Sequence, residues 1–246
     1  MNQNTPETVN ARFKKDLHKE ALKICAGLAY GDLRRTLDFN DVSDKEKLDF
    51  REKMYGLIFE WINDKLFSLT DPQSEFKRSH EEICGMIKKE AVSSNLFKNN
   101  KFTIGQAQKW LNMTLKNILI FNLCPDKMSD KLISSLHVPV DSIIIKKAWQ
   151  LDEVELPLKN GVNPHLITRG VHKGRTRLDC FLPWSQWDDY DDYFEFQTTL
   201  RKRLGSSSDY SSTIEWEFKA FNQKQDITIA ASDANDGMVE DFLQRE

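Results

Sequence analysis

A lysine and an aspartate are the two residues of this chain whose types and sequence neighbours are suited to a chemical reaction. Lys109 lies in a segment of helical periodicity that begins at Thr103, and Asp141 lies 32 positions further on. Asp141 ends the stretch Val138-Pro139-Val140-Asp141 and is followed by an apolar run. A neutral lysine amine is a nucleophile, and a fixed carboxylate stabilises positive charge that develops beside it.

Each residue also has an ordinary structural explanation. Pro139 disfavours helix in the residue before it, so Asp141 is predicted to be a helix N-cap, where its carboxylate accepts backbone N–H groups and gains from the helix dipole. Lys109 lies off the apolar stripe of its own helix, on the face that carries Asn112 and Lys116, where a lysine normally faces solvent. The two residues therefore indicate a function only when they are taken together.

Hydrophobic periodicity predicts an all-α fold. Capping-box spacings mark two helix starts, Ser43 to Glu46 and Thr103 to Gln106, and Asp71-Pro72 marks another. The first helix is expected to bury Phe13, Leu17, Ala21, Ile24 and Leu28. The expected helices span residues 6–28, run onward from 43, 71, 103 and 141, and span 184–204 and 213–221.

The segments between these helices divide the chain without splitting it into separate domains. Residues 122–129 form a break, residues 157–176 form a long loop, and residues 205–208 form a flexible connection. A β-hairpin is possible near residues 166–181, and residues 232–246 are an acidic tail. We expect one two-lobed helical bundle over residues 1–246, with a helix-hairpin-helix-like element.

Composition excludes several classes of protein. The 246 residues are 39% hydrophobic and 30% charged, with a mean hydropathy of -0.57, which is typical of a water-soluble globular chain. No apolar run reaches the ~20 residues of a membrane span, and the N-terminus lacks an apolar signal core. We therefore expect a cytoplasmic location and no membrane partner.

Neither the cysteines nor the histidines have metal-ligand spacing, so we expect no metal and no cofactor.

Positive charge is clustered although the net charge is -3. Lysines dominate residues 98–131, and residues 159–177 contain five lysines and arginines and no acid. Clusters of this kind can follow a phosphate backbone, but they are also common on ordinary solvated surfaces. Charge alone does not decide between these interpretations.

The combination of a glycine-containing turn, a helix that carries Gln108-Lys109, and Val138-Pro139-Val140-Asp141 at a later helix start resembles the helix-hairpin-helix DNA glycosylases. The 32-residue separation is longer than in the commonest members and looks like the archaeal 8-oxoguanine glycosylase branch. The resemblance covers residues 102–149. The family's hairpin usually carries two glycines, whereas this stretch has only Gly105.

The resemblance implies an enzyme that flips a damaged or modified base out of DNA and excises it, and it leaves open whether lyase activity follows. Lys109 would attack the sugar C1′ and form a Schiff base, and Asp141 would stabilise the developing positive charge. DNA would be the partner of a monomer. The implied DNA contacts are Lys101, Gly105, Gln106 and Lys116, and the candidates for the base pocket are Trp149, Trp187 and Asp188.

Two other functions remain open at this stage. The chain could be a non-catalytic all-α DNA-binding or protein-interaction module, in which the lysine–aspartate spacing is chance. It could also be an antiviral or toxin-system effector of another kind, with helices that form a partner surface. A nuclease is disfavoured, because there is no carboxylate cluster for two metals. The excised base, and a role in repair or in anti-phage defence, are not specified by the sequence.

Overall fold

The protein is all-α. The computed structural model describes residues 6–151, 154–159, 161, 165–166, 168, 173–206 and 210–222, and the predicted acidic tail at 232–246 lies outside them. Within this part of the chain there are eight α-helices and no strand. They are α1 (Pro6–Leu33), α2 (Asp44–Asp64), α3 (Pro72–Ser93), α4 (Ile104–Ile120), α5 (Asp130–Ser135), α6 (Ser142–Trp149), α7 (Tyr190–Gly205) and α8 (Thr213–Asn222).

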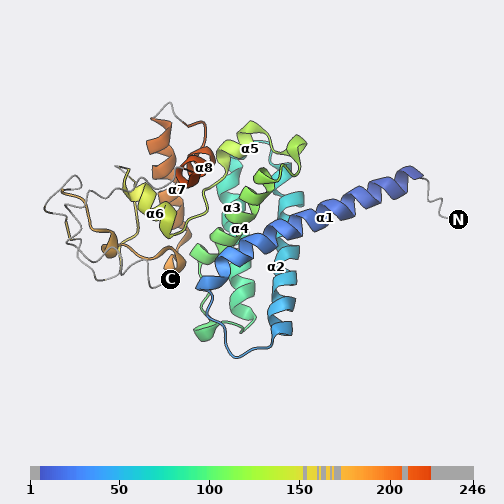
Figure 1. Cartoon of the computed structure of the whole chain (residues 1–246), viewed down its shortest axis with the longest axis horizontal. Coiled ribbons are helices and arrows are strands. Elements are labelled where there is room, and N and C mark those ends of the chain that lie inside the picture. The colour runs from blue at the N-terminus through green and yellow to red at the C-terminus, as the bar shows by residue number, and fades with distance from the viewer. Residues whose placement is uncertain are drawn as a thin grey trace.

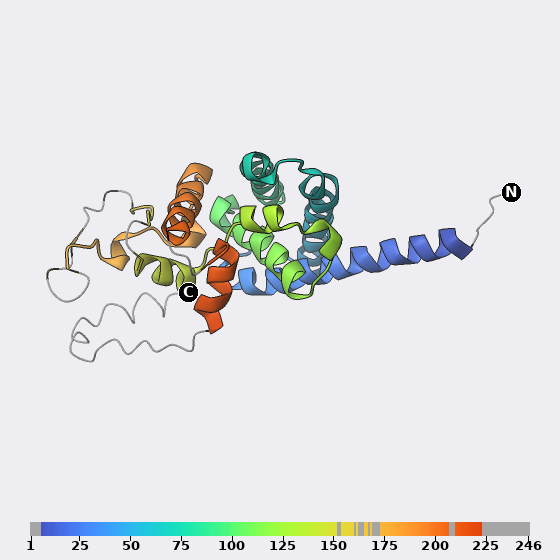
Figure 2. The same ribbon diagram turned by 90° about the horizontal axis from the view of Figure 1, so that it is seen from above.

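Helix α4 lies at the centre of the molecule. Helices α1, α2, α3 and α5 gather around it on one side, and α6, α7 and α8 lie on the other side (Figure 1). The view from above shows the same division, with the N-terminal part of α1 extending away from the bundle (Figure 2). None of the described helices is both long enough and apolar enough to cross a membrane.

The predicted start of α4 is confirmed. The Thr103 hydroxyl accepts the Gln106 N–H at 3.2 Å, and the Gln106 side chain accepts the Thr103 N–H at 3.0 Å, which completes a capping box. The predicted apolar stripe of this helix is buried, and so is most of its polar face. A helix that is covered on all sides must satisfy its polar side chains internally. Lys109 is therefore buried, in contrast to the solvent-facing position that is usual for a lysine off the apolar stripe.

The predicted buried face of α1 is wrong. Leu17 and Ile24, expected in the core, are 61% and 62% exposed. The buried face includes Ala26 and Tyr30, which lie against Trp110 of α4: the indole Nε1 donates to the Ala26 carbonyl at 3.0 Å, and the Tyr30 and Trp110 rings are 5.1 Å apart. The face of α1 that packs against the large indole is therefore buried, while the face that carries Leu17 and Ile24 is exposed.

Two other boundaries differ from the prediction. Helix α7 begins at Tyr190 rather than Trp184, because Asp189 is its N-cap and residues 184–186 form a separate 3₁₀ turn. The possible hairpin near 166–181 is represented by single antiparallel bridges, Leu166 with Thr176 and Leu158 with Phe181, and not by strands in the part that is described. Residues 167 and 169–172 of that segment lie outside the described residues.

A polar network crosses the core between α3, α4 and α7. His80 of α3 is fully buried; its Nε2 donates to Asn112 Oδ1 at 2.9 Å, and its Nδ1 is 2.8 Å from the Tyr190 hydroxyl. His137 is also buried and lies 2.8 Å from the Tyr193 hydroxyl. Burial lowers the pKa of His80 to about 4 and lowers the pKa of His137 well below its ordinary value.

The free energy of unfolding is expected to fall on acidification through this pair. The unfolded state takes up a proton near pH 6.5, whereas folded His80 stays neutral to about pH 4, so its contribution is fully present above pH 6.5 and is lost progressively as the pH falls to 4. The loss from His80 alone is on the order of 3 kcal/mol. Urea unfolding at several pH values measures the total, and imidazole NMR titration isolates His80. A His80 midpoint near 6.5 in the folded protein would contradict this expectation.

Candidate functional site

Lys109 and Asp141 form a direct ion pair. The Lys109 Nζ lies 2.7 Å from Asp141 Oδ2, and the two side chains are 7% and 19% exposed. Lys109 comes from the second turn of α4, and Asp141 from the residue before α6. The two residues that were singled out by type and spacing are therefore brought together, with the aspartate more open to solvent than the lysine.

Asp141 is also the N-cap that was predicted. Its Oδ1 accepts the Ile144 N–H at 2.8 Å while Oδ2 accepts from Lys109. The cap and the ion pair use different oxygens of the same carboxylate, so they do not compete. The cap fixes the direction of the carboxylate toward the Lys109 amine.

Two glutamines hold the extended segment that carries Asp141. Gln108 exchanges two hydrogen bonds with the Val140 backbone, each 3.3 Å. Gln197 of α7 does the same with the Val138 backbone, accepting the N–H at 3.1 Å and donating to the carbonyl at 2.9 Å. Each side-chain amide therefore pairs with the main chain as a neighbouring strand would. Asn112 braces Gln108 by donating to its Oε1 at 3.0 Å.

A second buried ion pair lies beside the first and was missed by the sequence analysis. Lys116, two turns after Lys109 on α4, pairs with Glu217 of α8, which is 1% exposed. A signal was present in the sequence: Glu217 lies three residues after Ile214 and three before Ala220, both of which are buried. A carboxylate on the apolar stripe of a short helix requires a buried partner.

The predicted phosphate contacts on α4 need correction. Gly105 is the second residue of α4 and is not in a hairpin turn; its N–H donates to the Trp187 carbonyl at 2.7 Å. The Gln106 side chain completes the capping box and donates to the Thr36 carbonyl at 2.7 Å. Lys116 is paired with Glu217, as described above. These groups have internal partners, so they do not present donors to DNA.

The remaining residues that were predicted to contact DNA or to line a base pocket differ in how exposed they are. Lys101 is exposed, and its contact with DNA stays a prediction. Trp187 is fully buried, donates to the Leu182 carbonyl at 2.9 Å and packs against other core side chains, which corrects its assignment to a base pocket. Asp188 lies at the surface, 2.7 Å from the Lys88 amine. Trp149 is partly buried at the end of α6.

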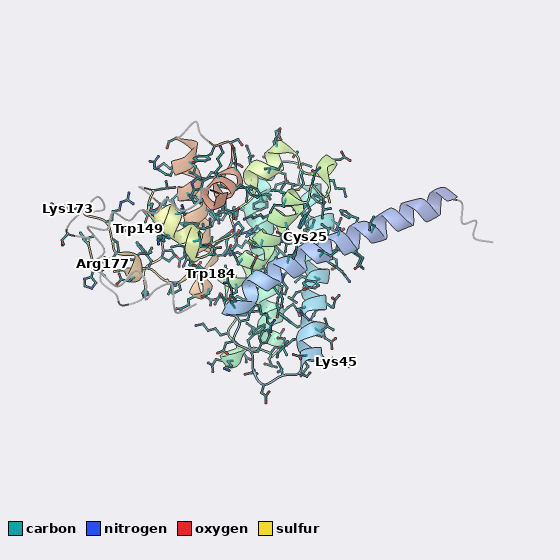
Figure 3. The ribbon with its side chains drawn as sticks, viewed as in Figure 1. Cys25, Lys45, Trp149, Lys173, Arg177 and Trp184 are labelled. Carbon is teal, nitrogen blue, oxygen red and sulfur yellow. The ribbon has the colours of Figure 1, made fainter. Side chains whose placement is uncertain are left out.

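Trp149 anchors part of the basic loop to α6. Its Nε1 donates to the Thr176 carbonyl at 3.0 Å, and the Arg175 guanidinium lies over its ring, 5.7 Å from the centroid. Figure 3 shows Trp149 on the same side of the molecule as Lys173 and Arg177. An eight-residue helix is about 12 Å long, so α6 carries Asp141 at one end and this basic segment at the other.

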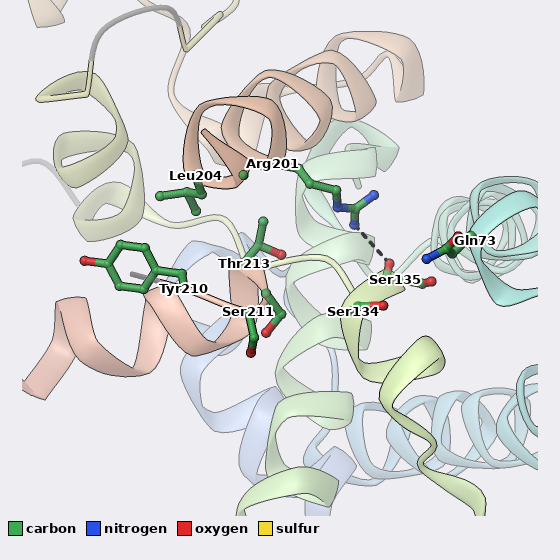
Figure 4. A pocket seen from close by; sticks show the side chains of 10 residues that line it. Gln73, Ser134, Ser135, Arg201, Leu204, Tyr210, Ser211 and Thr213 are labelled. Atoms are coloured by element: carbon green, nitrogen blue, oxygen red, sulfur yellow. Dashed lines mark hydrogen bonds between the residues drawn. The ribbon is translucent and has the colours of Figure 1, made fainter. Parts of the chain in front are cut away.

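The described cavities do not include a base pocket at the ion pair. A cavity of about 310 Å³ lies between α5, the end of α7 and the start of α8, where Arg201 donates to the Ser135 carbonyl at 3.1 Å (Figure 4). A smaller one, of about 60 Å³, lies beside Glu155. Lys109 and Asp141 line neither of these two cavities.

No group of three or more histidine, cysteine or acidic side chains suited to a metal ion occurs among the described residues. Comparisons of the chain with models of protein families, with curated proteins and with solved structures gave no match.

Proposed function

We propose that this chain is a DNA glycosylase with lyase activity, in which Lys109 is the nucleophile and Asp141 its electrostatic partner. The observation that supports the proposal is the 2.7 Å contact between these two side chains, which are 32 residues apart in sequence. An amine held on a buried helix beside a carboxylate fixed by a helix N-terminus is the arrangement that nucleophilic attack through a cationic transition state requires.

The reaction begins when a target nucleotide leaves the DNA stack, which costs a few kcal/mol and least for a damaged or poorly paired base. The Lys109 ammonium loses one proton to water, its nitrogen then forms a bond to the sugar C1′, and the bond between C1′ and the base breaks. The base leaves with the bonding electron pair and is protonated. Opening of the sugar ring gives a Schiff base on Lys109, and β-elimination from it cleaves the strand.

Asp141 acts in this reaction as a fixed negative charge. Positive charge grows on the sugar as the base departs, and a preorganised carboxylate stabilises that charge without reorganisation. The cap from the Ile144 N–H holds Oδ1 in place throughout. The basic segment that contacts Trp149 supplies positive charge for the phosphate backbone at the far end of α6. An oxidised base or a modified base of the kind found in phage DNA fits this chemistry.

A trapping experiment tests the proposal. Duplex oligonucleotides that carry different oxidised bases, modified bases or an abasic site are incubated with the full chain and cyanoborohydride, and adducts are resolved on denaturing gels. A covalent adduct together with release of a base supports the proposal. Base release without an adduct would assign a monofunctional reaction, in which Asp141 activates water. DNA binding without base release or adduct would favour the non-catalytic DNA-binding module.

Asp141→Asn is expected to separate the cap from the chemistry. The amide oxygen can still accept the Ile144 N–H, so the helix start is preserved, whereas the amide nitrogen meets the Lys109 amine with a donor instead of an acceptor. We expect base release to fall by about 100-fold or more, in line with the loss of one preorganised electrostatic contact. Single-turnover release rates measure this. Asp130→Asn, at an exposed position in the first turn of α5, is the control.

A role for Asp141 as a cap alone gives a different result. Release rates would then match those of the unmodified chain, and only a stability change of roughly 1 kcal/mol, the usual value for a helix cap, would remain.

A further inference from the structure

The cavity of about 310 Å³ lies where four helices meet, and neither Lys109 nor Asp141 lines it. Gln73 comes from the start of α3, two serines from the end of α5, Arg201 from the last part of α7, and Thr213 from the start of α8. The volume is at the lower limit of pockets that bind small molecules, ~300–1,000 Å³. Among the described residues that line the cavity, Arg201 carries the only charge.

Arg201 has no acidic partner in the described part of the chain. Its Nη2 donates to the carbonyls of Ser135 and Leu136, at 3.1 and 3.4 Å, whereas its Nε is buried without a hydrogen-bond partner. Burial lowers the pKa of the guanidinium because the charge is partly removed from water, yet arginine stays protonated in proteins. Charges withdrawn from water are normally paired, so this guanidinium is suited to an anion that enters the cavity.

Two helix N-termini add positive character to the same cavity. Gln73 is the second residue of α3, and Thr213 is the first residue of α8. The first N–H groups of an α-helix have no acceptor within the helix, and the helix dipole places a partial positive charge there. Phosphate groups commonly bind at such positions. The helix ends therefore favour the same kind of ligand as the guanidinium.

The acids near these helix starts are engaged elsewhere. Asp71 accepts a serine hydroxyl in the first turn of α3 at 2.7 Å, and Glu75 accepts two backbone N–H groups just before that helix at 2.9 and 3.1 Å. Glu215 accepts the Ser211 N–H at 2.7 Å and lies 2.9 Å from the Lys219 amine. None of the three carboxylates lines the cavity, so they leave its positive character in place.

The cavity has a polar end and an apolar end. Figure 4 shows the Arg201 guanidinium and the Gln73 amide directed toward the two serines of α5 from opposite sides, with Leu204 and the Tyr210 ring at the other end. The donors of the polar end thus come from different helices and different directions. A phosphate has three terminal oxygens that accept from several directions, whereas a carboxylate has two oxygens in one plane, so the polar end favours phosphate.

We propose that this cavity binds the phosphate group of a phosphorylated ligand. Arg201 pairs with the phosphate, Gln73 and the start of α8 supply further hydrogen-bond donors, and Leu204 and Tyr210 contact the organic group that carries it. Phosphates of this kind occur on small molecules and at the ends of DNA strands, and the experiment distinguishes these two sources. The proposal does not depend on the reaction of Lys109.

Calorimetric titration of the full chain with inorganic phosphate tests the site. Arg201→Gln removes the positive charge, and Gln73→Glu places a negative charge at the polar end while an acid in a first helical turn favours the helix. We expect each change to weaken phosphate binding by about tenfold or more, the usual effect of losing a charged hydrogen bond.

Lys202→Gln is the matched control. Lys202 follows Arg201 on α7, is exposed and does not line the cavity. The substitution changes the net charge by the same amount as the other two. Its affinity for phosphate is expected to stay within about twofold of that of the unmodified chain, because exposed charges contribute little. Circular dichroism verifies that each variant is folded, and Gln73→Glu decides the question if Arg201→Gln does not fold.

Two further probes identify the source of the phosphate. Ribose 5-phosphate that binds more tightly than inorganic phosphate, without competition from DNA, supports a small-molecule ligand. Competition by a duplex oligonucleotide with phosphorylated ends, lost in Gln73→Glu, supports a DNA strand end. No binding of phosphate to the unmodified chain at about 10 mM, well above a millimolar Kd, overturns the proposal. Equal affinity in the unmodified chain, Gln73→Glu and Lys202→Gln also overturns it, and neither result affects the glycosylase proposal.

Discussion

Replacing Lys109 with glutamine is expected to abolish the covalent adduct and to slow base release by about 1000-fold or more. Loss of the nucleophile prevents the first bond-forming step, on which all later steps depend. The rate is therefore expected to fall further than when a neighbouring group is replaced. The adduct on denaturing gels and single-turnover release rates measure the two losses. An adduct that persists in Lys109→Gln would assign the nucleophile to another amine.

The folded state should survive this substitution. Asp141 keeps the Ile144 N–H as a partner and is 19% exposed, so water can replace part of what the ammonium provided. The cost is therefore expected to lie below the 3–5 kcal/mol or so that is typical when one member of a fully buried pair is removed. Lys45→Gln is the control, because Lys45 is exposed in the first turn of α2 and is not one of the predicted site residues; its adduct yield should match that of the unmodified chain.

Gly105→Ala is expected to cause the largest loss of stability, about 3 kcal/mol or more. A Cβ at this position would lie 1.9 Å from the Trp184 carbonyl oxygen and 3.0 Å from its carbon. Both are main-chain atoms, so the clash cannot be relieved by a side-chain rotation. Relief requires the turn at 184–186 to move away from α4, which also breaks the Gly105 N–H bond to Trp187. Denaturant unfolding measures the loss.

The same change at Gly85 gives a matched control. Gly85 lies inside α3 on an exposed face, and an added Cβ would meet nothing within 4 Å. Alanine there should raise the free energy of unfolding by roughly 0.5–1 kcal/mol, because glycine is the poorer helix former. If Gly105 served only to contact phosphate, Gly105→Ala would weaken DNA binding at unchanged stability.

The sequence predicted several helix starts correctly, although not that of α7, because these starts depend on local hydrogen bonds. Ser43 with Glu46 and Thr103 with Gln106 both form the capping boxes that their spacing indicated. Asp141 caps α6 for the same reason. Such contacts form within four residues, so they are largely independent of the rest of the fold.

Which face of a helix becomes buried is a different question, because it depends on residues far away in sequence. On α1 a stripe of larger aliphatic side chains suggested one face, whereas the fit of Ala26 and Tyr30 to Trp110 selects another. A lysine off the apolar stripe normally faces solvent by the same reasoning, whereas Lys109 is buried because other elements cover most of α4. Hydrophobic periodicity compares only the composition of the helix faces. It contains no information about the shape of the side chains against which a face packs.

The candidate site was predictable only in part. Residue types and a motif resemblance drew attention to Lys109 and Asp141, and the two side chains are in contact. The resemblance also suggested phosphate contacts at Gly105 and Gln106, but their polar groups are used inside the protein. Glu217 follows Asp141 by 76 positions along the printed sequence, and no local pattern connects them. Contacts over such separations are specified by tertiary packing.

The two glutamine clamps have a consequence for how the protein is made. Gln108 precedes the valine that it holds, but Gln197 lies 59 residues after Val138. A nascent chain that has just passed residue 150 already contains the amine and the carboxylate, yet it lacks one of the two amides that fix their spacing. We therefore expect the segment that carries Asp141 to reach its final register only after α7 has been synthesised and docked.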